Sequence, residues 1–157
     1  MNESSTTMRN LAAALAGEAT AYMKYRYFAR LARAAGDIQT AETFETTAAQ
    51  EIHHALGHLD LLYPAESLTP ARMLELAIAG ETYEYTTMYP GFRDQAAIEQ
   101  SAQAQAEFSA QIDESREHAA VFAATLAKAE KRFTALAKVE QRHAHTYQER
   151  LQRVNEA

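Results

Sequence analysis

The sequence contains no cysteine among its 157 residues. This absence excludes disulfide bonds, thiolate zinc sites, iron–sulfur clusters and four-cysteine iron sites. Any metal ion that the chain binds must therefore be held by oxygen and nitrogen ligands.

Long apolar runs are also absent, and none approaches the roughly 20 residues that a membrane span requires. The polar stretch Met1–Asn10 lacks the pattern of a signal peptide. Basic residues occur singly or in pairs, never as a stripe interleaved with aromatic residues, which argues against nucleic-acid binding. We expect a cytoplasmic protein with neither a membrane nor a nucleic acid as partner.

Glycine and proline are scarce, at five and three residues, while the composition is 47% hydrophobic and 23% charged. Ala, Glu, Gln, Leu and Arg dominate, which is typical of an all-α protein. The length suits a single domain, taken as residues 1–157.

The first two helices are bounded by the few helix-breaking residues. Leu11–Ala35 ends at Gly36-Asp37, and Ile38–Leu62 ends at Tyr63-Pro64. These helices form a first hairpin, at about residues 8–63.

A second hairpin is expected at about residues 70–155. Thr69-Pro70 resembles a cap followed by proline at the first helical position, and Pro90-Gly91 should kink or break the helix that it opens. No glycine or proline follows, so we place the next turn at residues 111–115, where Asp113 or Ser115 could cap a new helix.

Several acidic residues and histidines recur three positions apart, which puts them side by side on a helix. A lone carboxylate, a pair of carboxylates and two Glu-x-x-His motifs are the ligands of a ferritin-like dimetal four-helix bundle. These residues are Glu18, Glu51, His54, Glu81, Glu84, Glu140 and His143. The oxygen and nitrogen ligands suit two iron ions, with manganese or a mixed pair as the alternative.

Residues at one level of an antiparallel hairpin should be equidistant from its turn. Glu18 and Glu51 have their midpoint between residues 34 and 35, beside Gly36. The third and fourth helices meet this condition if their turn lies at residue 112, midway between Glu84 and Glu140.

Other polar residues are interpreted as surface. His53 and His145 point away from the neighbouring ligands around the helix, and His58 is also placed at the surface. The segment 113–118, with Glu114, Glu117 and His118, is interpreted as solvated helix near the turn. A bundle whose glutamates are merely solvated, with no metal, remains a third possibility beside the two functions given below.

With these residues in view, the chain resembles the rubrerythrins over roughly residues 10–152. The resemblance implies that the seven residues above are iron ligands, with Glu51 and Glu81 as bridges. It also implies that one iron exchanges Glu84 for His54 between oxidation states, and that Tyr25 and Tyr89 support the site. The matching motifs are Ala16-Gly17-Glu18, Tyr25, Gln50-Glu51-x-x-His54-Ala55, Ala79-Gly80-Glu81-x-x-Glu84, Met88-Tyr89-Pro90 and Glu140-x-x-His143.

The resemblance implies a nonhaem diiron peroxidase that reduces hydrogen peroxide to water. The alternative is a ferritin-like protein that oxidises and sequesters iron. The chain resembles the single-domain, sulerythrin-like type without a rubredoxin domain, so electrons should come from an external donor such as a rubredoxin or a flavoprotein reductase.

Two spacings depart from the family pattern. Glu81 and Glu140 are 59 residues apart, against 33 for Glu18 and Glu51, an excess of 26 residues or about seven helical turns. The link at residues 63–70 spans at most about 28 Å. That link is short for the parallel second and third helices of a ferritin-like bundle, which favours a homodimer with its hairpins domain-swapped. The alternative is that the second and third helices end early and leave enough chain for a conventional crossover within one chain.

Overall fold

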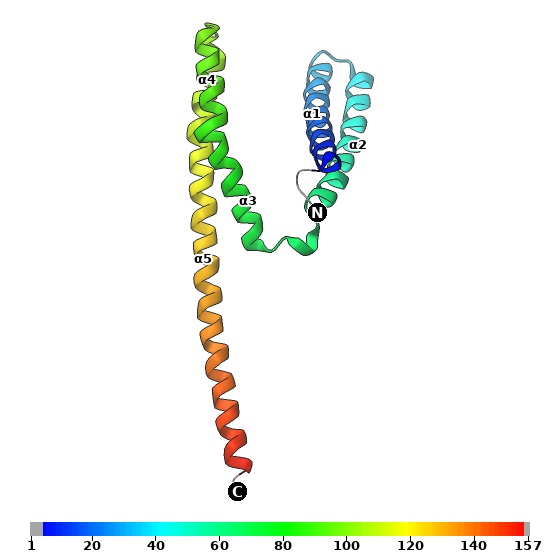
Figure 1. Ribbon diagram of the computed structural model, residues 1–157. Coiled ribbons are helices and arrows are strands. Elements are labelled where there is room, and N and C mark those ends of the chain that lie inside the picture. Colours follow the sequence, from blue (N-terminus) through cyan, green and yellow to red (C-terminus); the bar gives the residue numbers. More distant parts are fainter. Residues whose placement is uncertain (1–4, 156–157) are drawn as a thin grey trace. The chain divides into compact units, whose positions relative to one another are not determined.

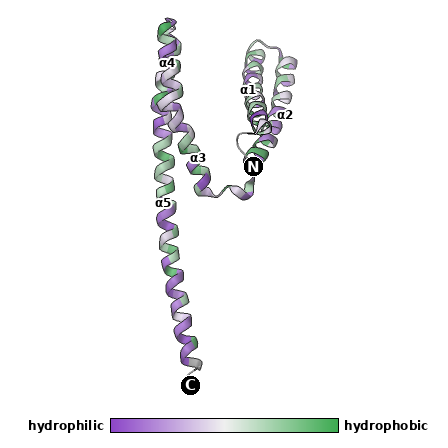
Figure 2. Ribbon diagram, viewed as in Figure 1, coloured by the Kyte–Doolittle hydropathy of each residue, from purple (hydrophilic) through white to green (hydrophobic). Residues whose placement is uncertain are grey.

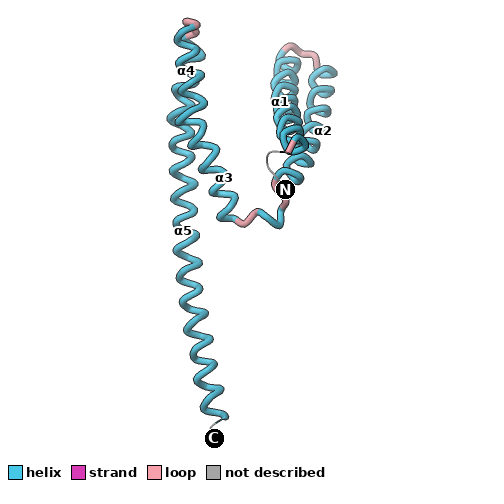
Figure 3. The backbone as a smooth tube through the Cα atoms, viewed as in Figure 1, coloured by secondary structure: helices cyan, strands magenta, loops and turns pink. Residues whose placement is uncertain are grey.

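The computed structural model describes residues 5–155, and all regular structure within them is helical. Two compact units lie on either side of the Leu68–Thr69 bond. The first contains α1 (Thr6–Ala34), α2 (Ile38–Leu62) and the short η1 (Ala65–Ser67), and the second contains α3 (Pro70–Tyr83), η2 (Glu84–Met88), α4 (Tyr89–Ile98) and α5 (Ala102–Asn155). Figures 1 and 3 show both units. The all-α prediction is confirmed.

The α1–α2 turn follows the predicted boundaries. Gly36 has φ +83°, the Gly36 N–H donates to Arg33 O and the Asp37 N–H donates to Ala32 O, the pair of hydrogen bonds that defines a Schellman ending. Asp37 then caps α2 by accepting a hydrogen bond from the Thr40 N–H at 3.0 Å, and this bond lowers the pKa of Asp37.

The α1–α2 pair is held together by small residues. Ala41, Ala48 and Ala55 recur every seven residues on α2 and are at most 3% exposed. This spacing keeps one face toward α1, and the small side chains let the helices approach closely. At the turn end, Phe44 packs against Tyr25 and Phe28 with ring centroids 5.8 and 5.5 Å apart.

Gly36→Ala should lower the free energy of unfolding by about 1 kcal/mol, because a β-carbon disfavours left-handed backbone. Gly57→Ala is the matched control: Gly57 lies within α2, and a β-carbon there meets no atom within 4 Å, so this change should raise stability by about 0.5–1 kcal/mol. Urea unfolding followed by circular dichroism measures both. Equal effects of the two changes would contradict the role given to Gly36.

The α4–α5 turn lies at residues 99–101, so the prediction of a turn at 111–115 is wrong. Gln100 has φ +58°. The Gln100 N–H donates to Ala97 O and the Ser101 N–H to Ala96 O. These bonds form a second Schellman ending with glutamine in the position that usually holds glycine. The turn therefore carries no glycine or proline signal in the sequence.

The predicted interruption of the third helix appears one turn before Pro90, as the π-helical segment η2, and the chain continues helically into α4. The Tyr89 N–H donates to Glu84 O, five residues back. Pro90 has no N–H and its ring crowds the preceding turn, and a widened turn relieves that conflict. Such π-bulges are frequent at functional sites.

Candidate metal centre

The α1–α2 unit brings together three of the predicted ligands, here called the first half-set: Glu18, Glu51 and His54. Their ligand atoms all lie within 4.8 Å of one another. His54 Nδ1 is 3.1 Å from Glu51 Oε2 and 3.9 Å from Glu18 Oε1. Both carboxylates are half-buried, while His54 is exposed. Two oxygen donors and one nitrogen donor thus converge on one point.

The α3–α5 unit contains a second half-set: Glu81, Glu84, Ser115 and His118. His118 Nδ1 lies 3.4 Å from Glu81 Oε1. The Ser115 hydroxyl donates a hydrogen bond to Glu84 Oε2 at 3.0 Å, and Ser115 is only 3% exposed. Glu81 and Glu84 are three residues apart, as are Ser115 and His118. Each carboxylate thus contacts one residue of the second pair across the hairpin.

Glu140 and His143 are not in this group, so the prediction that they lie level with Glu84 and Glu81 is wrong. They are on an exposed part of α5, 4.0 Å apart, with 77% and 60% of their side chains accessible. His143 lies 25 residues beyond His118, about 38 Å along the helix. In segment 113–118, Glu114 and Glu117 are exposed as expected, Ser115 is buried, and His118 is 58% exposed but lies against Glu81.

Ser115 and His118, which the sequence did not point to, lie level with Glu84 and Glu81, as judged by equal distance from the turn. Glu84 with Ser115, and Glu81 with His118, each have their midpoint at 99.5, at the observed turn. The remaining histidines divide: His53 and His145 are exposed as predicted, whereas His58 is half-buried.

One oxygen of the second half-set has no partner. Glu81 Oε2 is buried and accepts no hydrogen bond among the described residues. Burying an unpaired carboxylate oxygen is costly, and a bound cation would remove that cost. The donor set of both units therefore fits metal binding.

The two predicted tyrosines lie close to the half-sets in sequence and differ in environment. Tyr25 is half-buried in α1, against Phe44. Tyr89 stacks on Phe108 at 6.2 Å, and its pKa is raised above the usual value by burial and then by the negative charge of Glu84 and Glu81. Tyr89 therefore stays a neutral hydrogen-bond donor near Glu84.

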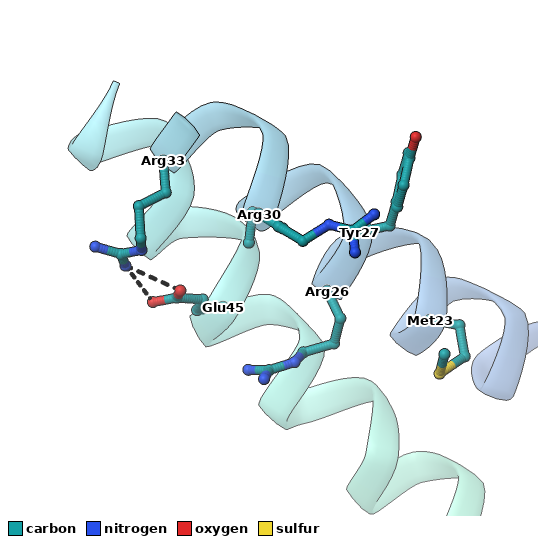
Figure 4. Close-up of a pocket in the computed structure, with 7 residues that line it drawn as sticks. Met23, Arg26, Tyr27, Arg30, Arg33 and Glu45 are labelled. Atoms are coloured by element: carbon teal, nitrogen blue, oxygen red, sulfur yellow. Dashed lines mark hydrogen bonds and ion pairs between the residues drawn. The ribbon is translucent and has the colours of Figure 1, made fainter. Parts of the chain in front are cut away.

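The α1–α2 unit also has a hollow of about 450 Å³, which the first half-set does not line (Figure 4). Three arginines line it, and Arg33 is paired with Glu45 at 2.8 Å. The hollow contains none of the predicted ligands.

Paired carboxylates and imidazoles on helical hairpins define a class of helical metal-binding proteins with oxygen and nitrogen ligands. The sequence model of the rubrerythrin family matches residues 9–126. The chain belongs to the rubrerythrin family, and membership implies a diiron protein. The family model ends at residue 126, before Glu140, whereas the resemblance was expected to continue to about residue 152.

Individual relatives agree with this assignment. The chain is 34% identical to a rubrerythrin of Porphyromonas gingivalis over 144 residues, which covers 83% of this chain and 72% of the relative. It is 38% identical over 100 residues to a rubrerythrin of Nitratidesulfovibrio vulgaris, covering 56% and 52%, and 36% identical over 111 residues to nigerythrin of that organism, covering 63% and 55%. The chain spans about half the length of these two Nitratidesulfovibrio relatives.

Among the described residues, no helix combines the length and hydropathy that crossing a membrane requires.

Proposed function

We propose that the two half-sets combine into one diiron centre in a ferritin-like four-helix bundle. The observation that carries this proposal is that each unit brings carboxylates and an imidazole together, while one oxygen of Glu81 is buried without a hydrogen-bond partner among the described residues. The proposed ligands are Glu18, Glu51, His54, Glu81, Glu84 and His118.

The charge of this ligand set supports the proposal. Four carboxylates carry four negative charges, which two divalent ions balance. The expected fifth carboxylate, Glu140, lies on the exposed part of α5. Ser115 is level with Glu84 instead, and its hydroxyl holds Glu84 by a hydrogen bond. Neutral imidazole nitrogen and carboxylate oxygen suit iron and manganese.

The proposed activity is reduction of hydrogen peroxide to two molecules of water, with two electrons from an external donor and two protons. A bound metal pair would supply the two electrons for this reaction, and the external donor would replace them. The donor is expected to be a rubredoxin or a flavoprotein reductase.

The chain's own residues hold and move protons in this scheme. Tyr89 keeps its phenol proton because burial and the nearby carboxylates raise its pKa, so its hydroxyl can orient peroxide by donating a hydrogen bond. We assign the same role to Tyr25. Ser115 holds Glu84 by a hydrogen bond, and Glu84 is the carboxylate proposed to exchange with His54 as ligand.

A stopped-flow comparison tests the activity. The iron-loaded protein is reduced without oxygen and then mixed with either hydrogen peroxide or oxygen. We expect faster oxidation by peroxide. Faster oxidation by oxygen, or growth of an iron mineral on added ferrous iron, would instead support the ferritin-like alternative.

A further inference from the structure

The helix α5 continues well beyond the hairpin that it forms with α3 and α4 (Figure 1). With the hairpin centred at 99.5, the first residue of α3, Pro70, is level with residue 129. Residues 130–155, here called the arm, extend a further 39 Å or so. Every arm side chain that the structure describes, at residues 130–153, is exposed except the half-buried Val139. The arm also lies outside the matched family segment.

The arm repeats the segment of α5 that packs in the hairpin, with a period of 25 residues. Seven of the 25 paired positions are identical, among them Phe108 with Phe133 and His118 with His143; the others pair Ala102, Ala104, Ala110, Ala119 and Leu126 with Ala127, Ala129, Ala135, Ala144 and Leu151. Phe122 corresponds to Tyr147, and Ser115 to Glu140. Because 25 residues are close to seven turns, the repeated residues lie on the same face.

That face is covered in the hairpin and open in the arm. Ile112, Ser115 and Ala119 are at most 8% exposed, whereas Phe133 is 66% and Tyr147 is 68% exposed. Figure 2 shows the arm as mainly hydrophilic, with a few short hydrophobic stretches. A helix this long gains most of its stability from packing an apolar stripe, so the arm needs a partner.

The residues of the stripe are complementary to themselves. In the hairpin, the imidazole of His118 meets the carboxylate of Glu81 across two antiparallel helices. The arm carries both groups, as Glu140 and His143, within a stripe that alternates steps of four and three residues: Phe133, Leu136, Glu140, His143 and Tyr147. The spacing from Leu136 to Tyr147 is symmetric about position 141.5.

We propose that the arm pairs in antiparallel orientation with the arm of a second copy of the chain. About a two-fold axis at 141.5, Glu140 faces the partner's His143 and Leu136 faces the partner's Tyr147, and each contact occurs twice, as a two-fold interface requires. Small residues, Ala137 and Ala144, flank the stripe and allow close approach. The proposal rests on the arm alone and does not depend on the proposed function.

The charge of the arm distinguishes pairing with a second arm from docking on the rest of a chain. Residues 127–155 contain seven Lys or Arg and three Glu, whereas residues 1–126 contain eight Lys or Arg and 17 Asp or Glu. Two basic arms repel one another, so salt should strengthen their pairing by screening. Docking of the arm on the acidic remainder of a chain should instead weaken with salt.

Disulfide trapping tests the pairing in the full-length chain, which has no natural cysteine. In the proposed pair, residues 137 and 144 flank the stripe on the same side, and residue 137 lies beside the partner's residue 144, about 3 Å along the helix from the level position. Within one chain these positions are seven residues apart, about 10.5 Å along the helix, too far for a disulfide. We expect the double variant Ala137→Cys/Ala144→Cys to form covalent dimers on mild oxidation, and each single variant to form none above the level of an outer-face control, Ala135→Cys.

Two further measurements sharpen the outcome. Leu136→Asp in the double variant should lower the yield of covalent dimer about tenfold or more, because it places a charge against the partner's Tyr147 in the seam, and higher salt should increase that yield. Dimers from the single variants would indicate parallel arms. The absence of dimers from the double variant would mean that the arm covers another surface, including the chain's own first unit. Either result, or a yield that falls with salt, overturns the proposal.

Discussion

The His118→Ala variant is expected to lose one of its two metal ions and to bind the other about 10 to 100 times more weakly. Its imidazole lies 3.4 Å from the carboxylate of Glu81, and loss even of an outer partner of a ligand typically costs that factor. Metal analysis of purified protein and titration with ferrous iron under nitrogen measure the effect. His118 has 58% of its side chain exposed, so the variant should fold, as circular dichroism can verify.

The matched control is His143→Ala, which removes the same side chain from the other copy of the 25-residue repeat. His143 is 60% exposed and lies far along α5 from Glu81 and Glu84, so metal content and affinity should match those of the unchanged chain. A loss of metal in His143→Ala, with none in His118→Ala, would restore Glu140 and His143 as the ligands and refute the site proposed above.

The contrast between these two histidines shows which parts of the fold and site the sequence could predict. The bounds of α2 and the turn at Gly36 were predictable, because Gly36 and Asp37 supply strong local signals. The turn at residues 99–101 was not, because Gln100 adopts a positive φ without being glycine. That turn is held by hydrogen bonds and by packing of α5 on α3 and α4, which are tertiary effects.

The turn expected at residues 111–115 also led to the prediction of Glu140 and His143 as ligands. Glu140-x-x-His143 is a complete Glu-x-x-His motif, whereas the packed copy has Ser115 in place of the glutamate. A search of the sequence for Glu-x-x-His motifs therefore finds Glu140 and His143, on the exposed part of α5, and not Ser115 and His118. Helical spacing shows which residues share a face, but only the position of the turn shows what that face contacts. An interruption was expected at Pro90-Gly91, but its π-helical form at Glu84–Met88 was not, although Pro90 gives a physical reason for it.

The second large effect concerns which chains supply the two half-sets. We expect Glu18→Ala alone and Glu81→Ala alone each to lose most of their iron, since each removes a carboxylate ligand from every site. The two variants are then co-expressed with different affinity tags, and only dimers that carry both tags are purified. If the hairpins are domain-swapped, one site of the mixed dimer combines two damaged half-sets and the other combines two intact ones, so iron should return to about half the content of the unchanged dimer.

The same experiment can exclude the swap. If each chain closes its own bundle, every site in the mixed dimer lacks either Glu18 or Glu81, and the iron content should stay at the level of the single variants. A control dimer of Glu18→Ala chains carrying both tags has no intact first half-set in either arrangement, so it sets the background. Recovery above that background requires an intact first hairpin on one chain and an intact second hairpin on the other, which together complete one metal site.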